Sequence, residues 1–203
     1  RKTTFKDNIY QLRGLDSEAR SDLADEILER FVKGRKEAIK QDEDFEKLMK
    51  LLAGYPLAME VVLANLKHQS PTEILQGLQL GELENVGEGE RTNNILKCVE
   101  YSHSNLSEAA QNLLLCLAPF SGFICRDFIP NYSNELQKLE PLQGYEFEQF
   151  DGAIEEAIHW GLLSPVDENY PNLLTIQPIF PYFLKTKLKA LTPETQEAIW
   201  EGF

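Results

Sequence analysis

The side chains best suited to chemistry in this chain are three histidines, His68, His103 and His159. They are widely separated in the sequence, and none has a carboxylate or cysteine beside it at the spacing of metal ligands. We expect two of them at helix ends and one on a long helix, at separate places in the fold. The sequence therefore predicts no metal site and no catalytic histidine.

Two acidic clusters and two serines are the other candidates for catalysis. Glu155-Glu156 and Asp42-Glu43-Asp44 have the residue types of an acid–base pair, but adjacent acids on a helix point in different directions and usually face solvent. Ser104 and Ser107 lack the strand–turn–helix context of a nucleophilic serine. No Gly-x-x-x-x-Gly-Lys-Ser/Thr occurs, and no expected strand ends in paired acids for magnesium. We therefore do not expect this chain to be an enzyme.

The three cysteines, Cys98, Cys116 and Cys125, are odd in number and too far apart for a zinc-binding pair, so we expect buried thiols. A chain of 203 residues can form one large or two small domains. No apolar run approaches the ~20 residues that span a bilayer, and the N-terminus has no signal pattern. We expect a cytoplasmic protein with no membrane partner.

The charge of the chain is strongly negative and unevenly spread. The formal net charge is −13; residues 1–100 hold 15 Lys and Arg against 19 Asp and Glu, whereas residues 101–203 hold 5 against 14. The second half therefore carries −9. This balance argues against nucleic acid or an anionic membrane as the main partner.

The elements of the first half meet at a sharp corner. A helical stripe of apolar residues ends shortly before Gly54, which suits a left-handed C-terminal cap, and Pro56 suits the first turn of a new helix. The stripe consists of Phe45, Leu48, Met49 and Leu52. An ordinary helical hairpin is the alternative interpretation, because it would have glycine and proline at the same positions.

Capping signals place the other helices of the first half. Asp16 or Ser17 begins a helix that runs to about Val32, and residues 33–42 form a charged connector. Ser70-Pro71-Thr72-Glu73 is a capping box that begins another helix. Residues 9–12 read as a short strand, and the Gly- and Glu-rich segment 81–90 as a domain boundary.

The second half is predicted to contain helices and one β-hairpin. Helices are expected near 94–101, from 106 to 117, from 126 to about 132 and over 145–160, followed by a hairpin of 162–166 and 173–176. A helix then begins at Pro178 or Ile179, and the next at Thr192. Three helices and a hairpin in this order are typical of a winged-helix module. The predicted fold is therefore mainly α, with a helical bundle over 1–85, a winged-helix domain over 91–190 and the start of a further helix over 191–203.

These motifs resemble one family, the signal-transducing NTPases with numerous domains (STAND) of the NB-ARC type. Gly54-Tyr55-Pro56-Leu57-Ala58 is similar to the Gly-x-Pro-Leu-Ala motif of that family's helical bundle. Residues 10–19 are similar to the segment that enters the bundle, and residues 106–120 to the first helix of its winged-helix domain. The order and spacing of these short motifs carry the resemblance, which spans nearly the whole chain.

The resemblance implies a nucleotide-contacting role for four residues. The proline of the motif, here Pro56 after Gly54, packs on the adenine of ADP in the family. Gln177 stands where the family has a histidine that reaches the β-phosphate; glutamine can donate a hydrogen bond but carries no charge. Arg1 occupies the place of the tail of the sensor arginine. No cofactor is expected in this fragment alone, and ADP or ATP with magnesium is expected in the parent protein.

The resemblance also implies the partners. An upstream P-loop domain would hold the nucleotide, and a downstream region, often of helical repeats, would bind protein partners. The expected function is that of a non-catalytic regulatory fragment that closes over the nucleotide and relays its state. Two alternatives stay open: a winged-helix transcription regulator, which would need a basic helix or wing, and a protein–protein interaction module without a nucleotide link.

Overall fold

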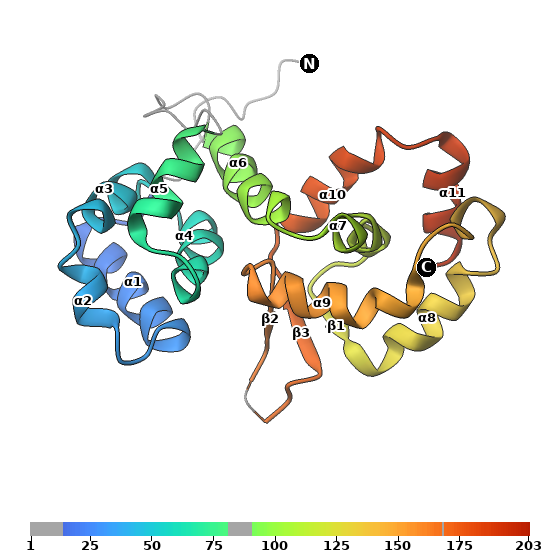
Figure 1. Cartoon of the computed structure of the whole chain (residues 1–203), viewed down its shortest axis with the longest axis horizontal. Helices are drawn as coiled ribbons and strands as arrows, with labels where there is room; N and C mark the ends of the chain where they lie inside the picture. Colours follow the sequence, from blue (N-terminus) through green and yellow to red (C-terminus); the bar gives the residue numbers. More distant parts are fainter. Residues whose placement is uncertain (1–13, 81–90, 168) are drawn as a thin grey trace, which may run out of the picture.

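A computed structural model describes residues 14–80, 91–167 and 169–203 of the chain. The protein is mainly helical with one small antiparallel sheet. Figure 1 shows α1 to α5 gathered on one side, α7 to α11 on the other, and α6 between the two groups. Arg1, the expected strand 9–12 and the expected boundary 81–90 lie outside the described residues.

Within residues 14–80, the first group consists of five α-helices and a 3₁₀ turn. These are α1 (Ser17–Phe31), α2 (Lys36–Lys40), α3 (Glu43–Leu51), α4 (Pro56–Ala64), the 3₁₀ turn η2 (Asn65–Lys67) and α5 (Pro71–Leu80).

The predicted caps of the first group are confirmed. The Asp16 carboxylate accepts a hydrogen bond from the Ala19 N–H at the start of α1. In the capping box, Ser70 N–H donates to Glu73 over 2.7 Å, and Glu73 N–H donates back to the Ser70 hydroxyl. Each cap satisfies backbone donors that the first helical turn leaves without partners.

The connector predicted at 33–42 is wrong in part, because it contains α2. Ile39 is buried in the core of the first group, and Lys36 and Lys40 both pair with Asp25 of α1. One apolar residue and two cross-helix ion pairs therefore order a segment whose sequence is mostly charged. Two adjacent apolar residues, Ala38 and Ile39, give no periodicity from which to predict a helix.

In the part of the chain described from residue 91 onward, α6 and the second group together hold six α-helices and three strands. They are α6 (Arg91–Ser104), α7 (Glu108–Leu114), β1 (Phe123–Cys125), α8 (Ile129–Leu136), α9 (Phe150–His159), β2 (Leu163–Pro165), β3 (Leu173–Ile176), α10 (Phe180–Leu188) and α11 (Pro193–Glu201). The 3₁₀ turns are η3 (Leu115–Leu117), η4 (Arg126–Phe128), η5 (Glu140–Leu142) and η6 (Phe147–Gln149).

The predicted hairpin is confirmed, and a third strand joins it. β3 pairs antiparallel with β2 and with β1, so that the strand order is β1-β3-β2. Ile124, Leu174 and Ile176 are buried on the inner face of this sheet. β1 was missed because three residues are too few to show an alternating pattern, and its pairing with β3 connects distant parts of the sequence.

The predicted helix over 145–160 is wrong at its start. α9 begins at Phe150, and Glu146 has φ −83° and ψ 65°, outside the helical region. Phe147 is nonetheless buried, in the core of the second group. The segment before α9 therefore enters the core as a turn and η6, although its apolar spacing also fits a helix.

Two hydrophobic clusters meet along α4 and α6. Most buried residues of α4 belong to the first cluster, but Val61 belongs to the second. On α6, Cys98 packs into the first cluster and its neighbour Val99 into the second. These two helices are therefore shared between both sides of the molecule. The packing of either side constrains the other.

Candidate functional site

The predicted corner between α3 and α4 is held by backbone contacts with the entry to α1. Gly54 has a left-handed φ of +72° as predicted, although the first left-handed residue after α3 is Ala53, with φ +51°. The Gly54 carbonyl accepts a 2.8 Å hydrogen bond from Leu15 N–H. A Cβ on Gly54 would lie 2.6 Å from the Leu15 carbonyl oxygen, and one on Gly14 would lie 2.0 Å from the Ala53 oxygen. Only glycine fits at these two crossing points.

Pro56 begins α4 as predicted and is exposed. Its ring stands at the first helical position, where proline costs no backbone hydrogen bond. Gly54 behind it is buried, so the backbone of the corner is fixed while the ring faces outward. The exposed Pro56 ring is therefore an apolar surface held in a fixed position by the corner.

Gln177 follows β3 and is 9% exposed. Its N–H donates to the Leu162 carbonyl, and its own carbonyl accepts from Phe180 N–H at the start of α10. Leu162 follows Gly161, where an added Cβ would lie 2.7 Å from Ala64 Cβ on α4. Gln177 is therefore connected to the C-terminal half of α4.

Pro56 and Gln177 relate to opposite parts of α4. The Ala64 contact lies eight residues beyond Pro56, which corresponds to about 12 Å along a helix at 1.5 Å per residue. Among the described residues no hydrogen bond links Gln177 to Gly54 or Pro56. The structure thus brings Gly54 and Pro56 together and sets Gln177 near the far end of the same helix.

A pair of histidines lies where the two sides of the molecule meet, which the sequence did not predict. The rings of His68, after η2, and His159, at the end of α9, stack with centroids 3.2 Å apart. The Nε2 atom of His68 is 2.9 Å from the His159 carbonyl oxygen, and Trp160 packs edge-on against His68. The expectation that His68 and His159 lie apart is wrong, because the turn η2 after α4 places His68 against the end of α9.

Burial and like charge disfavour protonation in this junction. Desolvation lowers the pKa of His159, and the neighbouring His68 and Lys67 lower it further, whereas Glu156 opposes them. Asn65 donates to the Ser102 hydroxyl over 3.0 Å and so joins η2 to α6. The junction therefore consists of short polar contacts between elements of both groups.

His103 lies apart from this pair, buried on α6 against Phe180 and Phe183. Burial lowers its pKa to about 4, and the nearby Lys187 acts in the same direction. Its Nε2 atom has no hydrogen-bond partner in the part of the chain that the structure describes. This histidine is a buried residue whose neutral form is favoured by desolvation.

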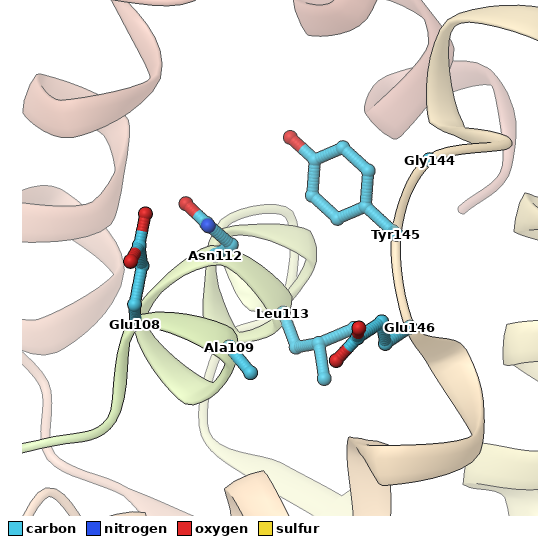
Figure 2. Close-up of a pocket in the computed structure, with 7 residues that line it drawn as sticks. All are labelled: Glu108, Ala109, Asn112, Leu113, Gly144, Tyr145 and Glu146. Carbon is cyan, nitrogen blue, oxygen red and sulfur yellow. The ribbon is translucent and has the colours of Figure 1, made fainter.

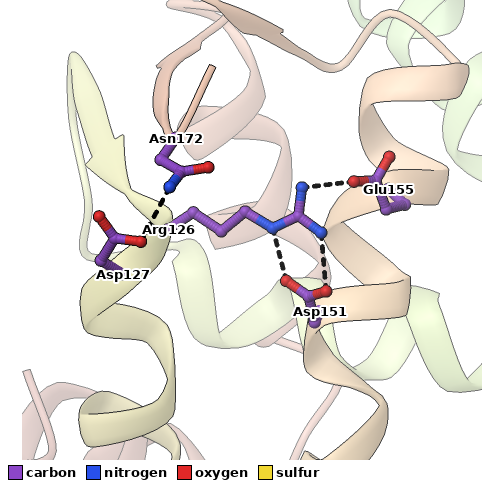
Figure 3. Close-up of polar contacts among 5 residues, drawn as sticks. All are labelled: Arg126, Asp127, Asp151, Glu155 and Asn172. Atoms are coloured by element: carbon purple, nitrogen blue, oxygen red, sulfur yellow. Dashed lines mark hydrogen bonds and ion pairs between the residues drawn. The ribbon is translucent and has the colours of Figure 1, made fainter. Parts of the chain in front are cut away.

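The acidic face of α9 is organised around one arginine, as Figure 3 shows. Arg126, directly after β1, donates two hydrogen bonds to Asp151 and a third to Glu155. These contacts raise the pKa of Arg126 and lower that of Asp151. Next to them, Asn172 donates to Asp127 over 3.0 Å and ties η4 to the hairpin.

The adjacent acids Glu155 and Glu156 do point in different directions, as predicted. Glu155 pairs with Arg126, whereas Glu156 accepts from the N–H and the hydroxyl of Ser107 at 2.7 and 2.8 Å. Ser107 in turn caps α7 through Ala110 N–H. Ser107 and both acids therefore have hydrogen-bond partners within the fold.

The cysteines are free thiols, but not all are buried as predicted. Cys98 and Cys116 are buried, and desolvation raises the pKa of each to about 12. Cys125 is half-buried, because it lies on the outer face of the sheet opposite Leu173. Among the described residues no group of three or more His, Cys, Asp or Glu could hold a metal ion.

A cavity of about 450 Å³ opens between α7 and the segment before η6. Figure 2 shows the Tyr145 ring extending from that segment toward the side of α7 that carries Glu108 and Asn112. The remaining lining residues are Ala109, Leu113, Gly144 and Glu146. No pattern in the sequence indicates this cavity, because its two walls come from separate segments and the sequence predicts a helix for one of them.

Comparison of the chain with protein-family models, with curated proteins and with solved structures found no match in any of the three. Of the helices within the described ranges, none has the length and apolar character needed to cross a membrane.

Proposed function

We propose that this chain is a non-catalytic regulatory region of a nucleotide-dependent signalling ATPase, made of a helical bundle and a winged-helix domain. In this proposal an upstream P-loop domain of the same protein holds ADP or ATP with magnesium. The bundle and the winged helix close over that nucleotide, and a downstream region binds protein partners. The proposal keeps the resemblance to the NB-ARC type of STAND proteins as its basis.

The observation that carries the proposal is the arrangement around α4. The exposed Pro56 begins this helix from a corner fixed by backbone contacts, and the second half of the same helix packs on Gly161 and shares its Val61 with the second core. A ligand that contacts Pro56 would thus press on an element that both sides share. Differential contact of this kind is what a switch between nucleotide states requires.

The order of elements in the second half supports the winged-helix part of the proposal. Helix α7, strand β1, helices α8 and α9, and the hairpin β2–β3 follow one another, with β1 added to the sheet beside β3. In this reading α9 is the helix that DNA-binding winged helices place in the major groove, and β2–β3 is the wing.

Charge favours a protein over DNA as the partner of this winged helix. α9 carries Asp151, Glu155 and Glu156 and no lysine or arginine, and the nearby Arg126 is already paired with two of these acids. DNA binding depends on basic residues that neutralise phosphates and release counterions. This observation counts against the alternative of a transcription regulator.

Three measurements test the proposal. Isothermal titration of this chain with ATP or ADP should show no micromolar binding, because the phosphate-binding groups would lie in the upstream domain. A fluorescence-anisotropy titration with generic duplex DNA at low salt should show no saturable binding with a dissociation constant below about 10 μM. That threshold lies within the range of dissociation constants for non-specific DNA binding. The full-length sequence should contain a P-loop upstream of Arg1. Micromolar nucleotide binding by the chain alone, or a full-length protein without a P-loop, would refute the proposal.

A further inference from the structure

The cavity between α7 and the segment before η6 has a distinctly anionic lining. Glu108 stands on one wall and Glu146 on the other, and no lysine, arginine or histidine is among its lining residues. Gln149 donates a 2.6 Å hydrogen bond to the Glu146 carboxylate. The cavity lies in the half of the chain that carries a net charge of −9. An approaching cation is therefore attracted both by the two carboxylates and by the field around them.

The rest of the lining suits a cation that is flat and partly apolar. Tyr145 contributes an aromatic face, and burial raises the pKa of its hydroxyl, so that it stays protonated. Ala109 and the buried Leu113 form an apolar floor, and Asn112 adds an amide. A guanidinium group stacks on aromatic rings, donates five hydrogen bonds in a plane and is weakly hydrated, whereas an ammonium is a compact, strongly hydrated charge.

We propose that this cavity receives an arginine side chain from a partner protein. The guanidinium lies in the cavity beside the Tyr145 ring, and Glu108 and Glu146 supply the negative charge that attracts it. The volume of about 450 Å³ is within the usual range of ligand pockets and leaves room for residues that flank the arginine. This inference concerns a different surface from the Pro56 corner and does not depend on nucleotide binding.

The test is an NMR titration of the full 203-residue chain with capped dipeptide-like probes. N-acetyl-arginine methylamide is compared with the lysine probe and with the citrulline probe, which keeps the shape of arginine and lacks its charge. We expect saturable shifts of the amides of 108–113 and 144–146, tightest for arginine, weaker for lysine and absent for citrulline.

Matched substitutions identify the groups responsible. Glu108→Gln and Glu146→Gln should each weaken arginine binding about threefold, because exposed ion pairs contribute modestly. Tyr145→Leu should weaken it by a similar factor through loss of the aromatic face. Glu148→Gln, an exposed neighbour outside this cavity, is the control and should leave the affinity unchanged. A one-dimensional spectrum of each variant confirms that it is folded.

Four results would overturn the inference. Citrulline could bind as tightly as arginine, the shifts could map away from the cavity, or the Glu108→Gln, Glu146→Gln double variant could bind arginine with unchanged affinity. An equal response to lysine and arginine would also contradict it, because it would show a general cation site with no preference for the guanidinium plane.

Discussion

The corner at Gly54 and the junction at His68 hold the same helix by different means. At the corner, Gly14 and Gly54 let two backbones cross, and an N–H of one donates to a carbonyl of the other. At the junction, side chains of His68, Asn65 and His159 make the contacts. A backbone crossing has no titratable group, whereas the junction contains the His159 imidazole, whose pKa burial lowers. The corner before α4 should therefore respond to substitutions of its glycines, and the junction after α4 should respond to pH.

The largest effect is expected at the corner. Gly54→Ala combines a left-handed backbone with a Cβ placed 2.6 Å from the Leu15 oxygen, so it should lower the free energy of unfolding by about 2–4 kcal/mol. Gly34→Ala is the matched control, since Gly34 has φ +88° and open space around its Cβ position. It should cost only about 1–2 kcal/mol for the backbone conformation. Urea denaturation of both variants measures the difference, and equal losses would show that the backbone crossing does not constrain the corner.

The next largest effect is a pH dependence of the free energy of unfolding caused by His103, which lies in the buried core and not in the junction. Its pKa is about 4 when folded and 6.5 in the unfolded chain, so the unfolded state takes up the proton first as pH falls. Its contribution is complete above pH 6.5 and is lost between pH 6.5 and 4, by at most about 3 kcal/mol. Urea denaturation at pH 7.5 and 4.5 should show a larger loss for the wild type than for His103→Gln. The same loss in both proteins would exclude His103 as the cause.

A smaller effect is expected at the junction itself. Burial, His68 and Lys67 lower the pKa of His159, so the intact junction disfavours protonation of this ring. The contacts between His68 and His159 should therefore weaken as pH falls below the ordinary histidine pKa of 6.5. Trp160 reports on this contact, and Trp200→Phe removes the second tryptophan. Fluorescence of that variant should change between pH 7.5 and 5.5, and adding His68→Gln should reduce the change. A fluorescence change that is unaffected by His68→Gln would contradict this view of the junction.

The same contrast explains what could be predicted from the sequence. Gly54, Pro56 and the Ser70 capping box act through the backbone of neighbouring residues, so their residue types already specify the local geometry. The hairpin was predictable for the same reason, because its two strands flank one turn-rich loop. The fold class, mainly helical with a small sheet, followed from such local signals.

Contacts between distant segments left no comparable signal. The stacking of His68 on His159, the pairing of Arg126 with Asp151, and the cavity beside Tyr145 each depend on where α9 lies relative to other elements. The start of α9 shows the limit most clearly, because Phe147 has the spacing of a helical core residue and reaches the core from a turn. Apolar periodicity indicates that a residue is buried, but it does not show whether that residue enters the core from a helix or from a turn.

Measuring how much nucleotide a Pro56 variant retains is the most direct test of the proposed function. In the full-length protein, Pro56→Ala should reduce the ADP that copurifies and is released on denaturation, because the exposed ring would be one wall of the adenine site. Alanine keeps α4 intact, since it is a good helix former. Pro193→Ala is the control, because Pro193 is likewise an exposed proline that begins a helix. The account predicts less ADP in Pro56→Ala than in wild type and no change in Pro193→Ala; equal ADP content in all three proteins would contradict it.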